Sequence, residues 1–284
     1  MSGAELPAQP QPSAAPAGRI ELGGELSVNR LGFGAMRLPG IWGEPEAATD
    51  AHRLLRRAIE LGVNFIDTAH AYGVSERRIG EALHPYPKNL VVATKSGLGR
   101  RGPDGRPETI RGQVERSLQL LRVERIDLLQ LHTIDPAVPI EESVGAIGEF
   151  QDGGKVRLIG VSNVSVEELE RARSVTRIAS VQNRYSLGDR SSEDVLAVCE
   201  RDTIAFLPYF PLGAGALARA RELQDVARAH RATPAQVALA WLLQRSPVML
   251  PIPGTSSLAH LEENVAAAGL RLSEEEFRRL SAST

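Results

Sequence analysis

From residue 31 to the end of the chain, short apolar runs alternate with amphipathic segments. The apolar runs predict eight strands, at residues 31–34, 63–67, 90–95, 126–131, 156–162, 179–182, 204–208 and 248–252. The segments between them predict helices near 49–61, 75–83, 107–121, 140–152, 165–173, 191–201 and 234–244. Eight strands that alternate with helices at this spacing are typical of an α/β fold, the (β/α)8 TIM barrel, and we expect that fold here.

The competing α/β architecture is a doubly wound sheet that binds a dinucleotide. Its fingerprint needs a glycine-rich turn between the first strand and the first helix. The candidate segment, residues 32–37, has Arg37 where the third glycine is required. We therefore expect no Rossmann unit.

The ends of the chain predict two additions to the barrel. Residues 1–17 are rich in Ala, Pro, Gln and Ser, which predicts a disordered tail. Residues 19–28 alternate around Gly23-Gly24, which predicts a β-hairpin in front of the barrel. With no long linker after residue 18, we expect residues 18–284 to form a single barrel domain that ends in a C-terminal helix and tail.

Charge and cysteine content narrow the classes of partner and compartment. The chain has 33 Lys and Arg against 35 Asp and Glu, a net charge of −2, which argues against nucleic acid or an anionic membrane as a partner. No apolar stretch is long enough for a membrane span, and no signal peptide is visible. The single cysteine, Cys199, favours the cytoplasm. The histidines lack metal-ligand spacing, so we expect no metal site.

Ionisable residues stand where three of the predicted strands end. Asp67 ends the second strand and Tyr72 follows five residues later, Lys95 ends the third, and His132 follows the fourth. Because the carboxyl ends of barrel strands share one face, these side chains should converge. A free phenol has a pKa of about 10, and a neighbouring ammonium stabilises its phenolate. The set therefore suits proton transfer to a carbonyl oxygen.

At this point the chain resembles the aldo-keto reductases. The resemblance covers residues 28–280, and its most specific pieces are residues 62–73 with Glu76, Lys95, Leu131-His132, 160–163, 181–183, 208–213 and 251–264. It implies a barrel that prefers NADPH and reduces aldehydes or ketones to alcohols reversibly. It also implies that Tyr72 protonates the carbonyl oxygen while Asp67 holds Lys95 and His132 orients the substrate.

The resemblance also implies a set of cofactor-binding residues. Ser162, Asn163 and Gln182 would bind the nicotinamide carboxamide, and Tyr209 would lie under the nicotinamide ring. The full set is Gly34, Ala35, Met36, Asp67, Ser162, Asn163, Gln182, Tyr209, Phe210, Pro211, Leu212, Gly213, Pro253, Gly254, Thr255, Ser256, Ser257, His260, Glu263 and Asn264. The predicted helix after Ser257 would place free N–H groups beside the adenosine phosphate.

Two positions depart from the commonest family pattern. Gly254 stands where a lysine is frequent, and His260 stands where an arginine often neutralises the 2′-phosphate. An imidazole is only partly charged at neutral pH, so NADH use is possible beside NADPH.

The leading interpretation is an enzyme that acts on a small-molecule carbonyl substrate, and the sequence leaves alternatives to it open. Segments 181–185, 208–213 and 251–257 look like bacterial branches that include pyridoxal reductases, also called pyridoxine 4-dehydrogenases. A second reading is a nucleotide-binding sensor or regulatory module with slow turnover. A third is a carbohydrate isomerase or lyase, which would leave Ser162, Asn163, Gln182 and Tyr209 without a role. The sequence leaves the oligomeric state and the physiological substrate open.

Overall fold

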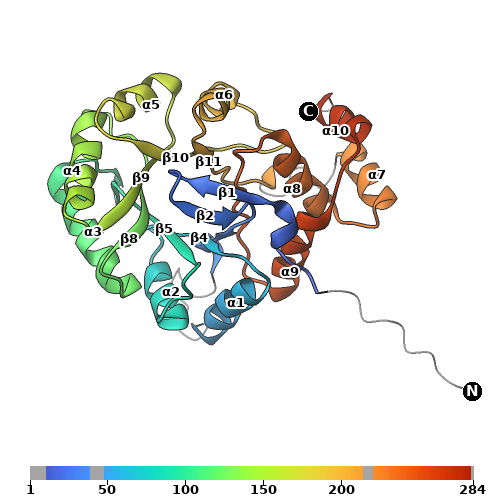
Figure 1. Cartoon of the computed structure of the whole chain (residues 1–284), viewed down its shortest axis with the longest axis horizontal. Helices are drawn as coiled ribbons and strands as arrows, with labels where there is room; N and C mark the ends of the chain where they lie inside the picture. The colour runs from blue at the N-terminus through green and yellow to red at the C-terminus, as the bar shows by residue number, and fades with distance from the viewer. Residues whose placement is uncertain (1–10, 39–47, 214–219, 283–284) are drawn as a thin grey trace, which may run out of the picture.

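The computed structural model describes residues 11–38, 48–213 and 220–282. Seven strands form one curled parallel sheet in the order β11-β10-β9-β8-β5-β4-β3, and helices surround it (Figure 1). The strands are β3 (Phe33–Gly34), β4 (Phe65–Asp67), β5 (Val91–Ser96), β8 (Ile126–Leu131), β9 (Val156–Ser162), β10 (Ile178–Gln182) and β11 (Ala205–Phe206). This arrangement confirms the predicted (β/α)8 fold.

The eighth predicted strand, residues 248–252, closes the barrel between β11 and β3 without forming a regular strand. On one side, Phe206 N donates to Val248 O at 2.9 Å and Leu250 N donates to Phe206 O at 2.8 Å. On the other side, Gly32 N donates to Pro251 O at 2.9 Å, and Gly34 N donates to Pro253 O. Proline has no N–H, so this edge can only accept, and a complete ladder cannot form.

The outer layer consists of helices around the sheet, the last of which packs against other helices. They are α1 (Ala48–Glu60), α2 (Ser75–Leu83), α3 (Pro107–Leu121), α4 (Ile140–Asp152), α5 (Val166–Arg173), α6 (Glu193–Asp202), α7 (Arg221–Ala229), α8 (Pro234–Arg245), α9 (Leu258–Ala266) and α10 (Glu274–Ala282). Local signals fix some of the starts: Thr233 and Gln236 form a capping box before α8, with Pro234 in the first turn. Among the described residues, no helix is long and apolar enough to cross a membrane.

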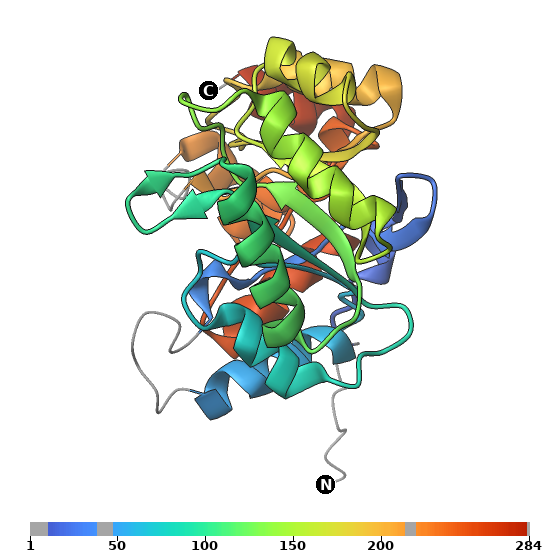
Figure 2. The same cartoon turned by 90° about the vertical axis from the view of Figure 1, so that its left-hand side faces the viewer.

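A β-hairpin covers the end of the barrel where the strands begin. Its strands, β1 (Arg19–Leu22) and β2 (Leu26–Asn29), pair antiparallel, and Gly23 and Gly24 turn the chain at φ of 56° and 69°. Leu22 and Val28 are fully buried in one cluster with Leu158 and Ala179 from the barrel interior. Figure 2 shows this hairpin on the opposite side of the barrel from a second one, β6 (Leu98–Gly99) with β7 (Gly102–Pro103).

The predicted disordered tail is wrong for its last residues. Ala14 and Ala17 are buried, Ala14 N donates to Leu61 O at 2.8 Å, and a short 3-10 helix spans Ala15–Ala17. Small alanine side chains fit closely against the barrel, so the proline-rich composition does not prevent packing. Residues 1–10 of the predicted tail lie outside the described residues.

Candidate functional site

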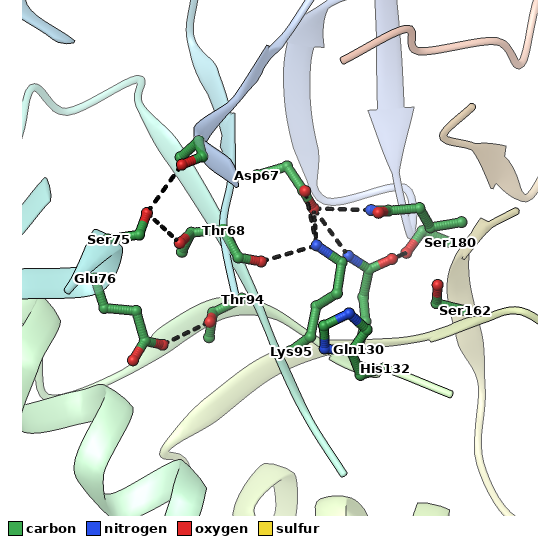
Figure 3. Close-up of polar contacts among 12 residues, drawn as sticks. Asp67, Thr68, Ser75, Glu76, Thr94, Lys95, Gln130, His132, Ser162 and Ser180 are labelled. Atoms are coloured by element: carbon green, nitrogen blue, oxygen red, sulfur yellow. Dashed lines mark hydrogen bonds and ion pairs between the residues drawn. The ribbon is translucent and has the colours of Figure 1, made fainter. Parts of the chain in front are cut away.

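Asp67 and Lys95 form a buried ion pair at the carboxyl end of β4 and β5 (Figure 3). Lys95 Nζ donates to both carboxylate oxygens of Asp67 at 2.7 Å and to the carbonyl oxygen of Thr68 at 2.8 Å. Lys95 is 1% exposed and Asp67 is 3% exposed. The three protons of the ammonium each have an acceptor, so a charge that would be costly to bury alone is compensated.

Tyr72 and His132 complete the predicted set of four residues, which we call the tetrad. Lys95 Nζ lies 5.2 Å from the centroid of the Tyr72 ring. The Tyr72 and His132 rings meet edge to face, with centroids 5.7 Å apart at 83°. The structure therefore brings together four side chains that are as far as 65 residues apart in sequence (132 − 67 = 65).

Burial and the Lys95 charge act in opposite directions on Tyr72. Burial raises the pKa of the Tyr72 phenol above its ordinary value, and Lys95 partly offsets this increase. The sequence predicts the effect of the ammonium, and its direction agrees, but desolvation is the larger cause. The phenol is consequently held in its protonated form in the site as it stands.

His132 is a neutral imidazole. Burial and the nearby Lys95 charge lower the pKa of His132 to about 3. Its Nδ1 is buried and has no hydrogen-bond partner among the described residues. A neutral ring at this position can orient a substrate oxygen without adding charge to the site.

Beneath the tetrad, the predicted residue Gln182 is joined by two polar residues that the sequence did not indicate, Gln130 and Ser180. Gln182 Nε2 donates to Asp67 Oδ1 at 2.8 Å, and Gln130 Nε2 approaches the same atom at 3.4 Å. Ser180 Oγ donates to Gln130 Oε1 at 3.4 Å. A Cβ at Gly160 would lie 2.2 Å from Ser180 Oγ, so a glycine is needed there to leave space for these hydrogen-bonded side chains. The signal that could have found Gln130 and Ser180 is their place two residues before His132 and Gln182 on the same strands.

A cavity of about 850 Å³ opens above the tetrad. Most of the predicted site residues line it: Gly34, Met36, Asp67, Tyr72, His132, Ser162, Asn163, Gln182, Tyr209, Phe210, Pro211, Leu212, Pro253, Gly254, Thr255, Ser256 and His260. Its wall also includes residues outside the predicted site: Arg37, Leu98, Leu223, Pro234, Ala235, Ala238 and Ile252. Six predicted residues are not part of its lining: Ala35, Lys95, Gly213, Ser257, Glu263 and Asn264.

Asn163 joins three of the loops that surround the cavity. Its Nδ2 donates to His132 O at 3.0 Å and to Ser162 Oγ at 3.1 Å, and Tyr209 Oη donates to its Oδ1 at 2.7 Å. The residue has a left-handed backbone with φ of 59°, which asparagine tolerates better than most side chains do. Tyr209 is thereby held beside the tetrad end of the cavity.

The glycine at position 254 has a steric cause. A Cβ at Gly254 would lie 2.7 Å from Gly34 O, and a Cβ at Gly34 would lie 2.6 Å from Ile252 O. The two backbones approach so closely that neither position has space for a side chain. The departure from the family lysine at 254 therefore follows from how β3 meets the closing segment.

The residues around α9 divide between the cavity and the packing of the helix. Ser256 and His260 line the cavity, whereas Ser257 Oγ caps the helix by accepting from His260 N at 3.5 Å. Glu263 accepts a hydrogen bond from Thr233, and its carbonyl accepts from Gln236 Nε2 at 3.1 Å. The structure thus turns Glu263 toward the start of α8.

In the part of the chain that the structure describes, no three His, Cys, Asp or Glu side chains gather in a way that could hold a metal ion.

Comparison with known proteins identifies the family of the chain. The model of the Aldo/keto reductase family matches residues 30–284. The chain belongs to the aldo/keto reductase family. An uncharacterized oxidoreductase of Schizosaccharomyces pombe is 47% identical over 277 residues, covering 94% of this chain and 90% of the relative. Pyridoxine 4-dehydrogenase of Escherichia coli is 44% identical over 268 residues, covering 89% of this chain and 93% of the relative.

Solved aldo-keto reductases share the fold over nearly the whole chain. A thermostable member in complex with the inhibitor epalrestat has a TM-score of 0.85 at 32% identity, covering 94% of this chain and 99% of its own. A Klebsiella pneumoniae member in complex with NADPH has a TM-score of 0.81 at 29% identity, covering 92% and 93% of the two chains. Family membership makes this aldo/keto reductase an oxidoreductase.

Proposed function

We propose that this aldo/keto reductase uses NADP(H) to reduce an aldehyde or ketone to an alcohol, with Tyr72 as the proton donor. The observation that carries the proposal is the buried Asp67–Lys95 pair beneath the Tyr72 ring, at one end of a cavity that reaches the start of α9. The printed ligand of the Klebsiella pneumoniae structure, NADPH, supports the choice of cofactor.

The residues of the cavity fit a nicotinamide dinucleotide. Its volume of about 850 Å³ falls within the range of about 300–1,000 Å³ usual for ligand sites. Near the tetrad, Ser162, Asn163 and Gln182 offer the hydroxyl and amide groups that a carboxamide requires. At the other end, Ser256 and His260 lie at the start of a helix, where an anionic phosphate is favoured. A bound nicotinamide cofactor supplies the hydride.

The chain's own residues supply the proton and orient the carbonyl. Tyr72 gives its phenolic proton to the carbonyl oxygen as negative charge develops there. His132, neutral and in the lining of the cavity, holds that oxygen. Lys95 stabilises the phenolate that remains, and Asp67 keeps the ammonium charged and in place.

The protonated phenol of Tyr72 is the form that the reductive step requires. Burial raises the pKa of the phenol, so the site keeps a proton ready for delivery. Lys95 limits that increase, which keeps proton release feasible once charge appears on the substrate oxygen. For the reverse reaction the phenol would first have to be deprotonated.

The relative from Escherichia coli suggests where to begin the search for a substrate. It is named a pyridoxine 4-dehydrogenase, and pyridoxal is the aldehyde that this name implies. We propose pyridoxal as the first substrate to test, among small aldehydes and ketones of other shapes.

Nucleotide fluorescence followed by turnover assays tests the proposal. NADPH and NADH are titrated into the protein, and NADPH oxidation is then followed with pyridoxal and a panel of aldehydes and ketones. Tight NADPH binding with turnover of a carbonyl supports the reductase. Binding without turnover of any carbonyl in the panel would favour the nucleotide sensor instead.

His260→Arg tests the choice between the two nucleotides. If His260 faces the 2′-phosphate, a guanidinium there should tighten NADPH binding about tenfold and leave NADH binding nearly unchanged, because only NADPH carries that phosphate. The NADPH/NADH ratio of dissociation constants is the measurement. An unchanged ratio would place His260 outside the phosphate site and leave Ser256 as the better candidate.

A further inference from the structure

His70 and Glu76 lie beside the tetrad but outside the cavity. Glu76 is on the first turn of α2 and is 2% exposed. Thr94, on β5 immediately before Lys95, donates its hydroxyl to Glu76 Oε1 at 2.6 Å (Figure 3). The other oxygen, Glu76 Oε2, is buried and has no hydrogen-bond partner among the described residues.

The uncommitted oxygen of Glu76 faces the uncommitted nitrogen of His70. His70 Nδ1 is also buried without a hydrogen bond within the described part of the chain, and it lies 3.7 Å from Glu76 Oε2. Buried polar atoms are nearly always satisfied in folded proteins, so two of them facing each other call for an explanation. An approach of less than about 1 Å would bring them to hydrogen-bond distance.

The backbone places this pair where it can act on Tyr72. His70 N donates to Lys95 O at 3.1 Å, so the residue is already fixed to β5. Tyr72 follows two residues later, in a short loop in which Tyr72 N donates to Ala69 O and Tyr72 O accepts from Ser75 N. A bond from His70 to Glu76 would join the first half of this loop to α2 and restrict where the Tyr72 hydroxyl can lie.

We propose that His70 and Glu76 are a positioning pair for Tyr72: His70 Nδ1 donates to Glu76 Oε2 and holds the β4–α2 loop in its reactive position. The inference rests on the proposed role of Tyr72 as the proton donor. Hydrogen bonds that support catalysis are often long in a ligand-free enzyme and shorten when the reactants are bound. Neither residue lines the cavity, so the pair acts on the proton transfer and leaves binding alone.

The test compares two substitutions of His70. His70→Leu removes the donor and should lower kcat by roughly tenfold, because a small displacement of a reacting group is costly. KM and the Kd of NADPH should stay within about twofold. His70→Asn, whose amide nitrogen can occupy the position of Nδ1, should recover most of the lost kcat.

The chain offers a matched control, a second histidine that faces a glutamate of α2. His52 on α1 faces Glu81 on α2, with His52 Nε2 3.3 Å from Glu81 Oε2, and its side chain is 25% exposed against 28% for His70. His52→Leu should leave kcat unchanged. In a Glu76→Gln background, which removes the accepting carboxylate, His70→Leu should lower kcat no further.

Several results would contradict the proposed role of the His70–Glu76 pair. These are an unchanged kcat in His70→Leu, a loss carried by KM, an equal loss in His52→Leu, or the same fold loss with and without Glu76. Tyr72→Phe, assayed beside these variants, separates the two proposals. If Tyr72→Phe is inactive and His70→Leu is normal, only the positioning pair fails. If Tyr72→Phe turns over normally, the proposed function itself fails.

Discussion

The two ends of the barrel are built from the same strands, but the polarity of their interior side chains changes over only two residues along a strand. On β4 the interior changes from Phe65 to Asp67, and on β5 it changes from Ala93 to Lys95. Where the strands begin, the interior is apolar and the β1–β2 hairpin seals it with Leu22. Where they end, it holds a charged pair and amide side chains. Side chains two apart on a strand share a face, so one strand serves both purposes.

The comparison separates stability from chemistry. The end under the hairpin consists of well-packed apolar side chains, which stabilise the fold by leaving water. The end that carries the tetrad contains buried polar atoms without hydrogen-bond partners among the described residues, at His132, Ser96, His70 and Glu76. Such atoms cost stability, and proteins retain them mainly where function requires polar groups. Substitutions at the two ends should therefore give different combinations of lost stability and lost turnover.

The largest effect is expected at the ion pair. Lys95→Met leaves the Asp67 carboxylate buried without its cation, which should cost about 3–5 kcal/mol of unfolding free energy and lower kcat as well. The double variant Asp67→Asn/Lys95→Met removes both charges and should regain much of the stability but not the kcat. Urea unfolding and turnover assays on both variants measure this. Recovery of kcat in the double variant would contradict the role given to the ammonium.

Tyr72→Phe should affect chemistry alone. It removes one hydroxyl, so the midpoint of thermal unfolding and the Kd of NADPH should hardly change. Turnover should fall at least roughly 10²-fold, the contribution expected of a general acid. Steady-state kinetics with an aldehyde substrate give the answer, and near wild-type turnover would mean that the proton comes from elsewhere.

At the opposite end, Leu22→Ala should affect stability alone. Leu22 is fully buried in the cluster under the hairpin, and its loss should cost about 2–3 kcal/mol of unfolding free energy. The kcat of the folded enzyme should stay within about twofold of wild type. A large fall in kcat with unchanged stability would show that the two ends are not independent.

The smallest effect is a pH dependence of stability from His132. The pKa of His132 is about 3 in the folded protein and about 6.5 in an unfolded chain, so between these values the unfolded state binds more protons. His132 therefore does not reduce the free energy of unfolding well above pH 6.5. As the pH drops below that value, the free energy of unfolding falls, by about 1.4 kcal/mol at pH 5.5. Wild type should lose that much more than His132→Asn between pH 7.5 and 5.5 in urea unfolding. Equal losses would mean that the imidazole is not held neutral.

Local sequence was enough for the regular elements and for the convergence of the tetrad. The predicted strand at 126–131 and the predicted helix at 107–121 have the same bounds in the structure, as β8 and α3. Apolar periodicity depends only on residues that are close in sequence, so it can be read from the sequence directly. Once eight parallel strands are predicted, the position of Asp67, Lys95 and His132 at strand ends requires them to meet on one face.

Contacts between distant segments could be decided only by the tertiary structure. The pattern at 248–252 predicts a strand, but Pro251 and Pro253 meet β3 as acceptors only. Gly254 is glycine because the backbone of Gly34 lies against it, and Ala14 is buried because the barrel covers it. The neutral form of His132 likewise follows from burial beside Lys95, 37 residues away in sequence (132 − 95 = 37). Close approach and desolvation depend on which segments contact each other in space, and the periodicity of the sequence does not determine those contacts.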